Sequence, residues 1–318
     1  MREKSRILKK SIGVDIGGTN LKTAIVMESG EYEHLSYRDT EARKGPKQII
    51  RNLKLEIKKL LDLNNNIVGI GIGCAGQVKV GTGEVYDPPN FPNWHKENLK
   101  EIIEKEFGLT TFVDNDGTVA AFAESLFGAG RDSNYFMLVV LGTGVGAGLV
   151  FNKKIYHGSI GIAGEFGHFT VNFDGPQCKC GQNGCIERYV GSKWIVEQAN
   201  QMISQNPKSK LNELPEDEWT PKRISDLANA GDKLCIQVMN NVGTHLGIAL
   251  GSVINLLNLD MIAIGGGISN AGSVLFDPMK KSLQKHSMSI PQSMVEIRRA
   301  ELGEYAGIIG AGSMVFTN

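Results

Sequence analysis

The sequence lacks a net charge, because Lys plus Arg and Asp plus Glu both number 34 in a chain of 318 residues. A balanced chain has no overall field to attract nucleic acid or an anionic lipid surface. It also lacks any run of about 20 apolar residues, the length that a membrane span needs. The first ten residues, MREKSRILKK, are basic but lead into no apolar stretch typical of an export signal. We therefore expect a cytoplasmic protein with no nucleic-acid or membrane partner.

Cysteine is scarce and odd in number, with five residues in the chain. Without an export signal, an odd set of cysteines argues against a disulfide framework. Cys74 and Cys235 lie in apolar surroundings and are expected to be buried thiols. Cys178, Cys180 and Cys185 fall within eight residues and need another explanation.

Low-complexity segments are absent, and strand and helix patterns alternate along the chain. In the first half the patterns predict strand–turn–strand over 11–26, helices over 47–63, 97–107 and 118–128, and strands over 67–76 and 110–116. In the second half they predict strand–turn–strand over 135–154, helices over 188–204, about 222–258 and 305–316, a strand over 261–272, and a surface excursion over 206–221. This order predicts an α/β architecture. The length favours two lobes, and the repeated strand–turn–strand layout indicates an internal duplication.

The first glycine-rich turn, DIGGTN, is neither a dinucleotide-binding fingerprint nor a Walker motif. Gly17 and Gly18 have no Cβ, so their backbone N–H groups can approach phosphate oxygens, and Thr19 adds a hydroxyl. Asp15, at the strand end, is a candidate ligand of Mg²⁺. The alternative is a purely structural hairpin turn.

Two further glycine-rich segments follow buried strands later in the chain. They are Gly142-Thr143-Gly144 and Gly265-Gly266-Gly267. Two phosphate-binding hairpins with a third glycine loop nearby suit a nucleotide bound between two lobes, which favours the binding interpretation over the structural one.

The three clustered cysteines have the spacing of a metal knuckle. Cys178, Cys180 and Cys185, with His168 upstream, form a Cys₃His set suited to tetrahedral zinc. A redox pair would more usually read C-x-x-C, and a nucleic-acid knuckle would have basic and aromatic neighbours. Because all four positions would be filled by protein ligands, we expect a structural zinc site.

Two carboxylates flank this knuckle, Glu165 just before the histidine segment and Glu187 just after the last cysteine. Carboxylates that are held rigidly are good acceptors for the hydroxyls of a polyol. The alternative is that both are solvated loop charges.

Five motifs in order resemble the ROK family of sugar kinases and sugar-responsive repressors over essentially the whole chain. They are VDIGGTN (14–20), VDNDGTVAA (113–121), LGTGVGAG (141–148), HGSIGIAGEFGH (157–168) and CKCGQNGCIE (178–187). The resemblance implies a two-lobed actin/hexokinase-like (ribonuclease H-like) ATPase fold with an interlobe cleft. We expect a smaller lobe from 1–116 plus about 300–318, and a larger lobe from 117–299 with the knuckle.

The resemblance also implies the roles of individual residues, and Asp116 matches the catalytic base. The implied sugar contacts are Asn115, Glu165, His168 and Glu187, with Gly76 and Asn90 as further candidates. The implied phosphate contacts are Gly17, Gly18, Thr19, Gly142, Thr143 and Gly144, beside Asp15 as a magnesium candidate. Gly265, Gly266 and Gly267 resemble the loop beside the adenosine, and His168, Cys178, Cys180 and Cys185 match the zinc ligands.

The position of Asp116 agrees with this role. It lies at the start of a predicted helix, where the macrodipole favours an ionised carboxylate, and phosphoryl transfer needs only a weak base. The alternative is a plain N-cap. One departure concerns the sugar: this chain has Cys74-Ala75-Gly76-Gln77 where family members commonly have a proline before the glycine. That leaves the preferred hexose open.

The leading hypothesis is ATP-dependent phosphorylation of a hexose at its 6-hydroxyl, with glucokinase activity first. The cofactors would be ATP, Mg²⁺ and structural Zn²⁺, and family resemblance suggests a homodimer or homotetramer. Other acceptors remain open, namely mannose, fructose, N-acetylmannosamine and N-acetylglucosamine, as do other phosphoryl donors such as polyphosphate. A sugar-sensing repressor is disfavoured because it needs an added helix-turn-helix domain of some tens of residues. A zinc-bearing interaction module with an inactive kinase site is the third hypothesis.

Overall fold

The structure is a computed structural model that describes residues 9–64 and 66–317. Residues 1–8 of the basic N-terminal segment considered above lie outside the described residues. By contacts the chain forms two compact units. The first comprises the described residues within Met1–Asp132, Gly148–Gly164 and Glu301–Asn318, and the second comprises Ser133–Ala147 and Glu165–Ala300.

A five-stranded sheet forms the centre of the first unit, with the order β3-β2-β1-β4-β8. Its strands are β1 (Lys10–Ile16), β2 (Asn20–Met27), β3 (Tyr32–Asp39), β4 (Ile67–Cys74) and β8 (Thr111–Asn115). β1, β4 and β8 are parallel, whereas β2 pairs antiparallel with both β1 and β3. A small antiparallel sheet contains β5 (Gln77–Lys79), β6 (Glu84–Tyr86) and β7 (Lys96–Asn98).

A second five-stranded sheet has the order β11-β10-β9-β12-β13 and so repeats the topology of the first. Its strands are β9 (Tyr135–Leu141), β10 (Val145–Phe151), β11 (Lys154–Ile155), β12 (Met261–Gly265) and β13 (Glu296–Arg299). β9, β12 and β13 are parallel, and β10 and β11 are antiparallel. The predicted α/β architecture and the duplicated layout are both confirmed.

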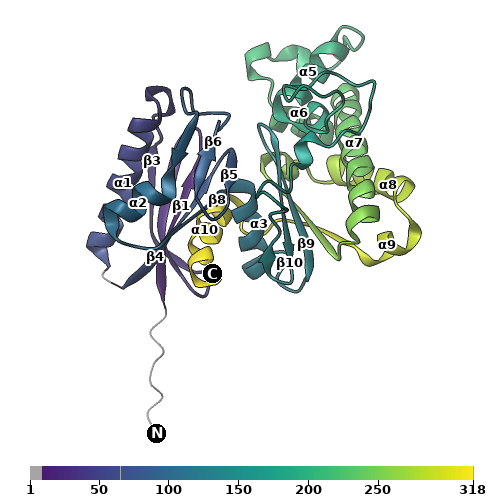
Figure 1. Ribbon diagram of the computed structural model, residues 1–318. Helices are drawn as coiled ribbons and strands as arrows, with labels where there is room; N and C mark the ends of the chain where they lie inside the picture. The colour runs from purple at the N-terminus through teal and green to yellow at the C-terminus, as the bar shows by residue number, and fades with distance from the viewer. Residues whose placement is uncertain (1–8, 65, 318) are drawn as a thin grey trace. The chain divides into compact units, whose positions relative to one another are not determined.

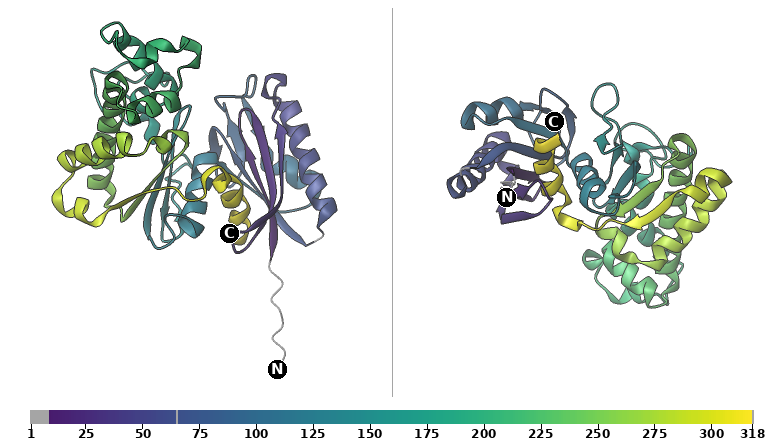
Figure 2. Two further views of the ribbon diagram at one scale, coloured as in Figure 1. Left: turned by 180° about the vertical axis from the view of Figure 1, so that it is seen from behind. Right: turned by 90° about the horizontal axis from the view of Figure 1, so that it is seen from below.

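The two faces of the first sheet differ because the strands alternate large and small residues. Ile12 and Val14 join the core formed with α1 (Pro46–Leu63) and α2 (Leu99–Phe107). On the other face, a Cβ placed on Gly13 would lie 2.1 Å from the carbonyl oxygen of Ile308. The C-terminal helix α10 (Ala306–Thr317) can therefore lie directly on β1 and β4, far from them in sequence (Figures 1 and 2).

Helix α3 (Asp116–Phe127) packs against α10 within the first unit. Its fully buried Glu124 accepts hydrogen bonds from the N–H groups of Ala129 (2.9 Å), Glu301 (3.1 Å) and Leu302 (2.7 Å). These bonds tie α3 to the segment that leads into α10. By contacts, α3 therefore belongs to the first unit, and residues 148–164 belong to it as well. The predicted division placed both segments in the larger lobe.

The second unit carries most of the remaining helices. They are α4 (Glu187–Val190), α5 (Ser192–Ile203), α6 (Pro221–Asn229), α7 (Lys233–Leu257), α8 (Ser273–His286) and α9 (Ser289–Met294). The helix predicted over about 222–258 is two helices, because Gly231 adopts φ 90° and Asp232 caps α7 by accepting from the Cys235 N–H at 3.0 Å. Within the described residues, no helix is both long and apolar enough to cross a bilayer.

Candidate functional site

The carboxyl ends of three parallel strands meet at one edge of the first sheet. The register aligns Ile16 with Cys74 and Cys74 with Asn115, so the segments that follow β1, β4 and β8 start side by side. The predicted site residues at this edge are Asp15, Gly17, Gly18, Thr19, Gly76, Asn115 and Asp116. The structure therefore brings together seven positions drawn from three separate motifs.

The turn between β1 and β2 leaves backbone donors available. Gly17 N–H donates to Asn20 O at 3.0 Å, and Thr40 Oγ1 donates to Gly17 O at 2.7 Å. The N–H groups of Gly18 and Thr19 have no partner among the described residues. Asn90 lies against this turn, since a Cβ on Gly18 would be 2.8 Å from its Cβ. The predicted phosphate turn thus offers two free amides, with the predicted residue Asn90 beside them.

Asn115 is the N-cap of α3. Its side-chain oxygen accepts from the N–H groups of Gly117 (2.9 Å) and Thr118 (3.2 Å), and its Nδ2 donates to Gly76 O at 3.0 Å. The alternative interpretation of Asp116 as the cap is therefore wrong. Asn115 also links the Gly76 segment to the start of α3. The sequence predicted only a sugar contact for Asn115 and not this link.

Two carboxylates with perturbed acidity lie at this edge. Burial raises the pKa of Asp116, although a hydrogen bond from the Gly117 N–H at 2.8 Å opposes the shift. Burial, followed by the charge of Asp116, raises the pKa of Asp15 to about 6, while Lys22 lowers it. The helix dipole therefore does not dominate the pKa of Asp116, contrary to the argument from sequence. Carboxylates near one another and near a phosphate turn are the kind of ligands that Mg²⁺ uses.

The turn between β9 and β10 in the second unit has the same construction. Gly142 N–H donates to Gly144 O at 3.0 Å, and Ser192 donates to Gly142 O through both its N–H (3.0 Å) and its hydroxyl (2.7 Å). The N–H groups of Thr143 and Gly144 have no partner among the described residues. This second predicted phosphate turn also presents two consecutive free amides.

The third glycine segment lies at the same edge of the second sheet, because β9 and β12 are parallel neighbours. Gly266 adopts φ 81°, and a Cβ there would lie 2.2 Å from Leu141 O. Gly265 ends β12, and Gly267 begins a 3-10 helix with open space around its Cβ position. Only Gly266 of the three is confined by both its backbone angle and its neighbours.

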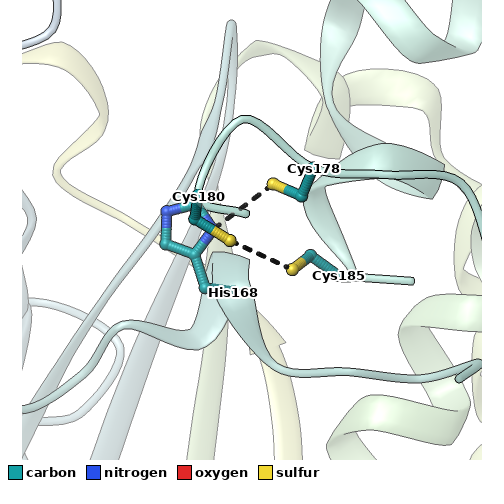
Figure 3. A group of neighbouring side chains, drawn as sticks. All are labelled: His168, Cys178, Cys180 and Cys185. Carbon is teal, nitrogen blue, oxygen red and sulfur yellow. Dashed lines mark hydrogen bonds between the residues drawn. The ribbon is translucent and has the colours of Figure 1, made fainter. Parts of the chain in front are cut away.

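The four predicted metal ligands converge. The ligand atoms of His168, Cys178, Cys180 and Cys185 all lie within 4.8 Å of one another (Figure 3). His168 Nδ1 is 3.7 Å from Cys178 Sγ, and the Sγ atoms of Cys180 and Cys185 are 3.6 Å apart. A tetrahedron built with normal zinc bond lengths separates such atoms by about 3.6–3.8 Å. The donor set therefore fits zinc.

The clustered thiols also perturb one another's acidity. All five cysteines are free thiols. Burial, together with the neighbouring Cys180 and Cys178, raises the pKa of Cys185 to about 12. Three thiolates would repel one another at this spacing unless a metal ion neutralised them. Gly181 and Gly184 form the reversal with φ 91° and 68°, as the spacing predicted.

The two carboxylates beside the knuckle differ in environment. Glu187 is only 8% exposed, and its Oε2 accepts from the Val145 N–H at 3.1 Å, next to the Gly142–Gly144 turn. Its Oε1 lies 3.6 Å from Lys179 Nζ. Glu165 is exposed. The description of both as solvated loop charges fits the surroundings of Glu165 and does not fit those of Glu187.

One pair of site residues was missed by the sequence argument. Asp114 is 2% exposed, and its Oδ2 lies 2.6 Å from His157 Nε2. Both residues lie in motifs quoted above, but nothing in the sequence indicated that they contact each other. The predicted residues otherwise fall into two sets: the first unit holds Asp116 and its neighbours, and the second holds the Gly142 turn, the Gly266 segment and the knuckle.

Comparison with known proteins agrees with this geometry. The ROK family model matches residues 11–318. The chain is 35% identical to a glucokinase of Halalkalibacterium halodurans, covering 96% of this chain and 94% of that protein. It is 33% identical to a glucokinase of Thermotoga maritima, covering 96% and 97%. The crystal structure of a ROK family glucokinase from Streptomyces griseus in complex with glucose and AMPPNP superposes with a TM-score of 0.82 at 30% identity, covering 97% of this chain and all of that one.

The chain therefore belongs to the ROK family, as its motifs predicted. Its fold is the mixed α/β fold of the ROK sugar kinases, which confirms the predicted actin/hexokinase-like class.

We expect the glycines of the β12 loop to differ sharply in their tolerance of a side chain. Gly266→Ala should reduce the free energy of unfolding by about 2–4 kcal/mol, because the methyl group meets Leu141 O in a backbone conformation unfavourable for alanine. Gly267→Ala is the matched control and should change it by less than about 0.5 kcal/mol. Urea unfolding followed by circular dichroism measures both. Equal stability of the two variants would contradict the assigned packing.

Proposed function

We propose that this protein is an ATP-dependent hexokinase that transfers the γ-phosphoryl group of ATP to the 6-hydroxyl of glucose. The class, a sugar kinase, follows from relatives named glucokinase that match over the full length of the chain. The observation that carries the chemistry is the edge of the first sheet, where a partly buried carboxylate not used for capping lies beside a turn with free amides.

Asp116 is the proposed general base. Its neighbour Asn115 is the N-cap of α3, and the Asp116 carboxylate accepts a hydrogen bond from the Gly117 N–H at 2.8 Å. A pKa raised by burial brings the carboxylate closer to the working pH, which improves proton acceptance by a base. Because the transition state of phosphoryl transfer is loose, the base removes the proton late and its modest strength is sufficient.

The free amides are the proposed phosphate ligands. Gly18 and Thr19 in one unit, and Thr143 and Gly144 in the other, each offer consecutive N–H donors of the kind that bind phosphate oxygens. Asp15 would hold Mg²⁺, which neutralises negative charge on the phosphates when it is bound. Gly265, Gly266 and Gly267 are the proposed adenosine-side loop.

The hexose would contact Asn115, Glu165, His168 and Glu187, with Gly76 and Asn90 as further contacts. His168 turns Nδ1 toward the thiolates, so its Nε2 faces away from the metal position (Figure 3). Zinc, held by His168, Cys178, Cys180 and Cys185, would be structural, because four protein ligands would occupy all the positions of tetrahedral coordination. The cytoplasmic location and the homodimeric or homotetrameric assembly stay predictions.

A substrate panel tests the proposed function. With ATP and Mg²⁺, the purified protein should release ADP when glucose is added, faster than with mannose, fructose, N-acetylmannosamine or N-acetylglucosamine. A coupled spectrophotometric assay measures this release, and replacing ATP with polyphosphate tests the donor. If no sugar in the panel stimulates ADP release, the proposal fails.

Substitution of the proposed base separates chemistry from binding. Asp116→Asn should lower kcat by about 10²–10⁴-fold, because the 6-hydroxyl has no proton acceptor. Glucose affinity should change less than about threefold, since an amide still bonds to the hydroxyl. Stopped-flow rates and calorimetric glucose binding measure the two effects. Asp62→Asn, an exposed residue of α1, is the matched control and should be neutral. A kcat of Asp116→Asn near that of the wild type would exclude Asp116 as the base.

Removal of one metal ligand tests the coupling of zinc to the sugar contacts. Cys180→Ser should release zinc and weaken glucose binding at least about tenfold, because Glu165, His168 and Glu187 lose their common support. Elemental analysis and calorimetry measure zinc content and affinity. Cys235→Ser, at a thiol outside the cluster, should retain zinc. Wild-type glucose affinity in a zinc-free variant would show that the metal does not organise the sugar contacts.

A further inference from the structure

The pair formed by Asp114 and His157 belongs to none of the roles assigned above. Asp114 is the penultimate residue of β8 and is 2% exposed. Its Oδ1 accepts from the Asn115 N–H at 2.7 Å, and its Oδ2 lies 2.6 Å from His157 Nε2. His157 is the residue that connects this buried carboxylate to another part of the first unit, 43 positions away in sequence.

His157 opens a tight loop that covers residues 157–164. Gly158, Gly161 and Gly164 have φ values of 68°, 96° and 95°, and Ala163 N–H donates to His157 O at 3.1 Å. A Cβ on Gly161 would lie 3.2 Å from the carbonyl oxygen of Val78, so the loop is packed against β5. The loop therefore has three positions whose backbone angles favour glycine. Its first residue, His157, links the loop to β8 through Asp114.

The two ends of this connection lead directly to proposed sugar contacts. Asp114 is followed in the chain by Asn115, whose Nδ2 holds Gly76 O at 3.0 Å. The loop is followed in the chain by Glu165. A buried carboxylate oxygen without a hydrogen-bond partner lowers the stability of the folded state. Removal of the imidazole would therefore favour rearrangement of the end of β8 and of the 157–164 loop.

We propose that His157 is a positioning residue for hexose binding, which through its hydrogen bond to Asp114 fixes the 157–164 loop and the Asn115–Gly76 contact in their binding conformation. This inference rests on the proposed function. It assigns His157 no contact with the reacting atoms, and its effect is on the acceptor sugar and not on the nucleotide.

The test compares three variants by steady-state kinetics with glucose and ATP varied separately. His157→Ala should raise the KM for glucose on the order of tenfold, because Asp114 Oδ2 loses its hydrogen-bond partner and the 157–164 loop loses its link to β8. The KM for ATP should stay within twofold and kcat within threefold. His157→Gln should recover most of the glucose affinity, because its amide can donate to Asp114. His95→Ala is the matched control, since His95 is 90% exposed in the same unit.

Hydrogen–deuterium exchange separates local positioning from general destabilisation. In His157→Ala, the amides of residues 157–164 should exchange faster, whereas those of α1 should match the wild type. An unchanged KM for glucose overturns the proposal, as does an equal rise of both KM values or failure of glutamine to restore affinity. If the wild type itself phosphorylates no hexose, the proposed function fails, and that result is distinct from an active wild type with an unaffected His157→Ala.

Discussion

Two turns, one at the edge of each five-stranded sheet, contain consecutive backbone amides that have no partner among the described residues. A buried or half-buried N–H needs an acceptor, and a turn that withholds one must receive it from water or a ligand. Each hairpin closes with one hydrogen bond, and the next two N–H groups, of Gly18 and Thr19 or of Thr143 and Gly144, have no partner among the described residues. Other contacts hold these turns: Thr40 bonds to Gly17 O, and Ser192 bonds to Gly142 O. The donors are therefore pre-oriented, which is the condition for binding phosphate without a large reorganisation.

At the end of β8, the adjacent residues Asn115 and Asp116 have different roles. Asn115 satisfies the first amides of α3, which a helix N-terminus requires. The next residue, Asp116, is thereby released from capping and lies in a partly buried position where its pKa rises. Had the carboxylate been the cap, hydrogen bonds from two amides would have stabilised its charge and weakened it as a base. A shift of one residue thus separates helix initiation, at Asn115, from the proton transfer proposed for Asp116.

Local patterns predicted much of this fold, because hydrophobic periodicity and glycine-rich turns are written in contiguous residues. β1, β4, α1 and α3 were predicted within a few residues of their observed bounds. β3 was missed because none of its residues is fully buried, so the strand carries no strong hydrophobic alternation. α8 was missed as well, and it carries Pro278 in its interior. The helix over 222–258 was predicted as one because the break at Gly231 is a single residue between two apolar patterns.

In the candidate site, too, features formed by neighbouring residues were predicted, and contacts between residues far apart in the sequence were not. The knuckle was predictable, since three of its ligands lie within eight residues and the glycines that reverse the chain lie between them. The bond of Asp114 with His157 joins residues 43 positions apart in the sequence, and the bond of Glu187 with the Val145 N–H joins residues 42 positions apart. A pattern in neighbouring residues cannot predict contacts at such sequence separations.

The Glu187 contact changes how the knuckle should be understood. One carboxylate oxygen of Glu187 is committed to the strand that leaves the Gly142–Gly144 turn, and a Cβ on Gly144 would lie 2.6 Å from that same oxygen. Glycine at 144 therefore admits the carboxylate, because it has no Cβ that would collide with it. The other oxygen of Glu187 lies 3.6 Å from Lys179 Nζ. The knuckle and the Gly142–Gly144 turn are consequently joined by a buried side chain, which links the Cys185–Glu187 segment to the start of β10.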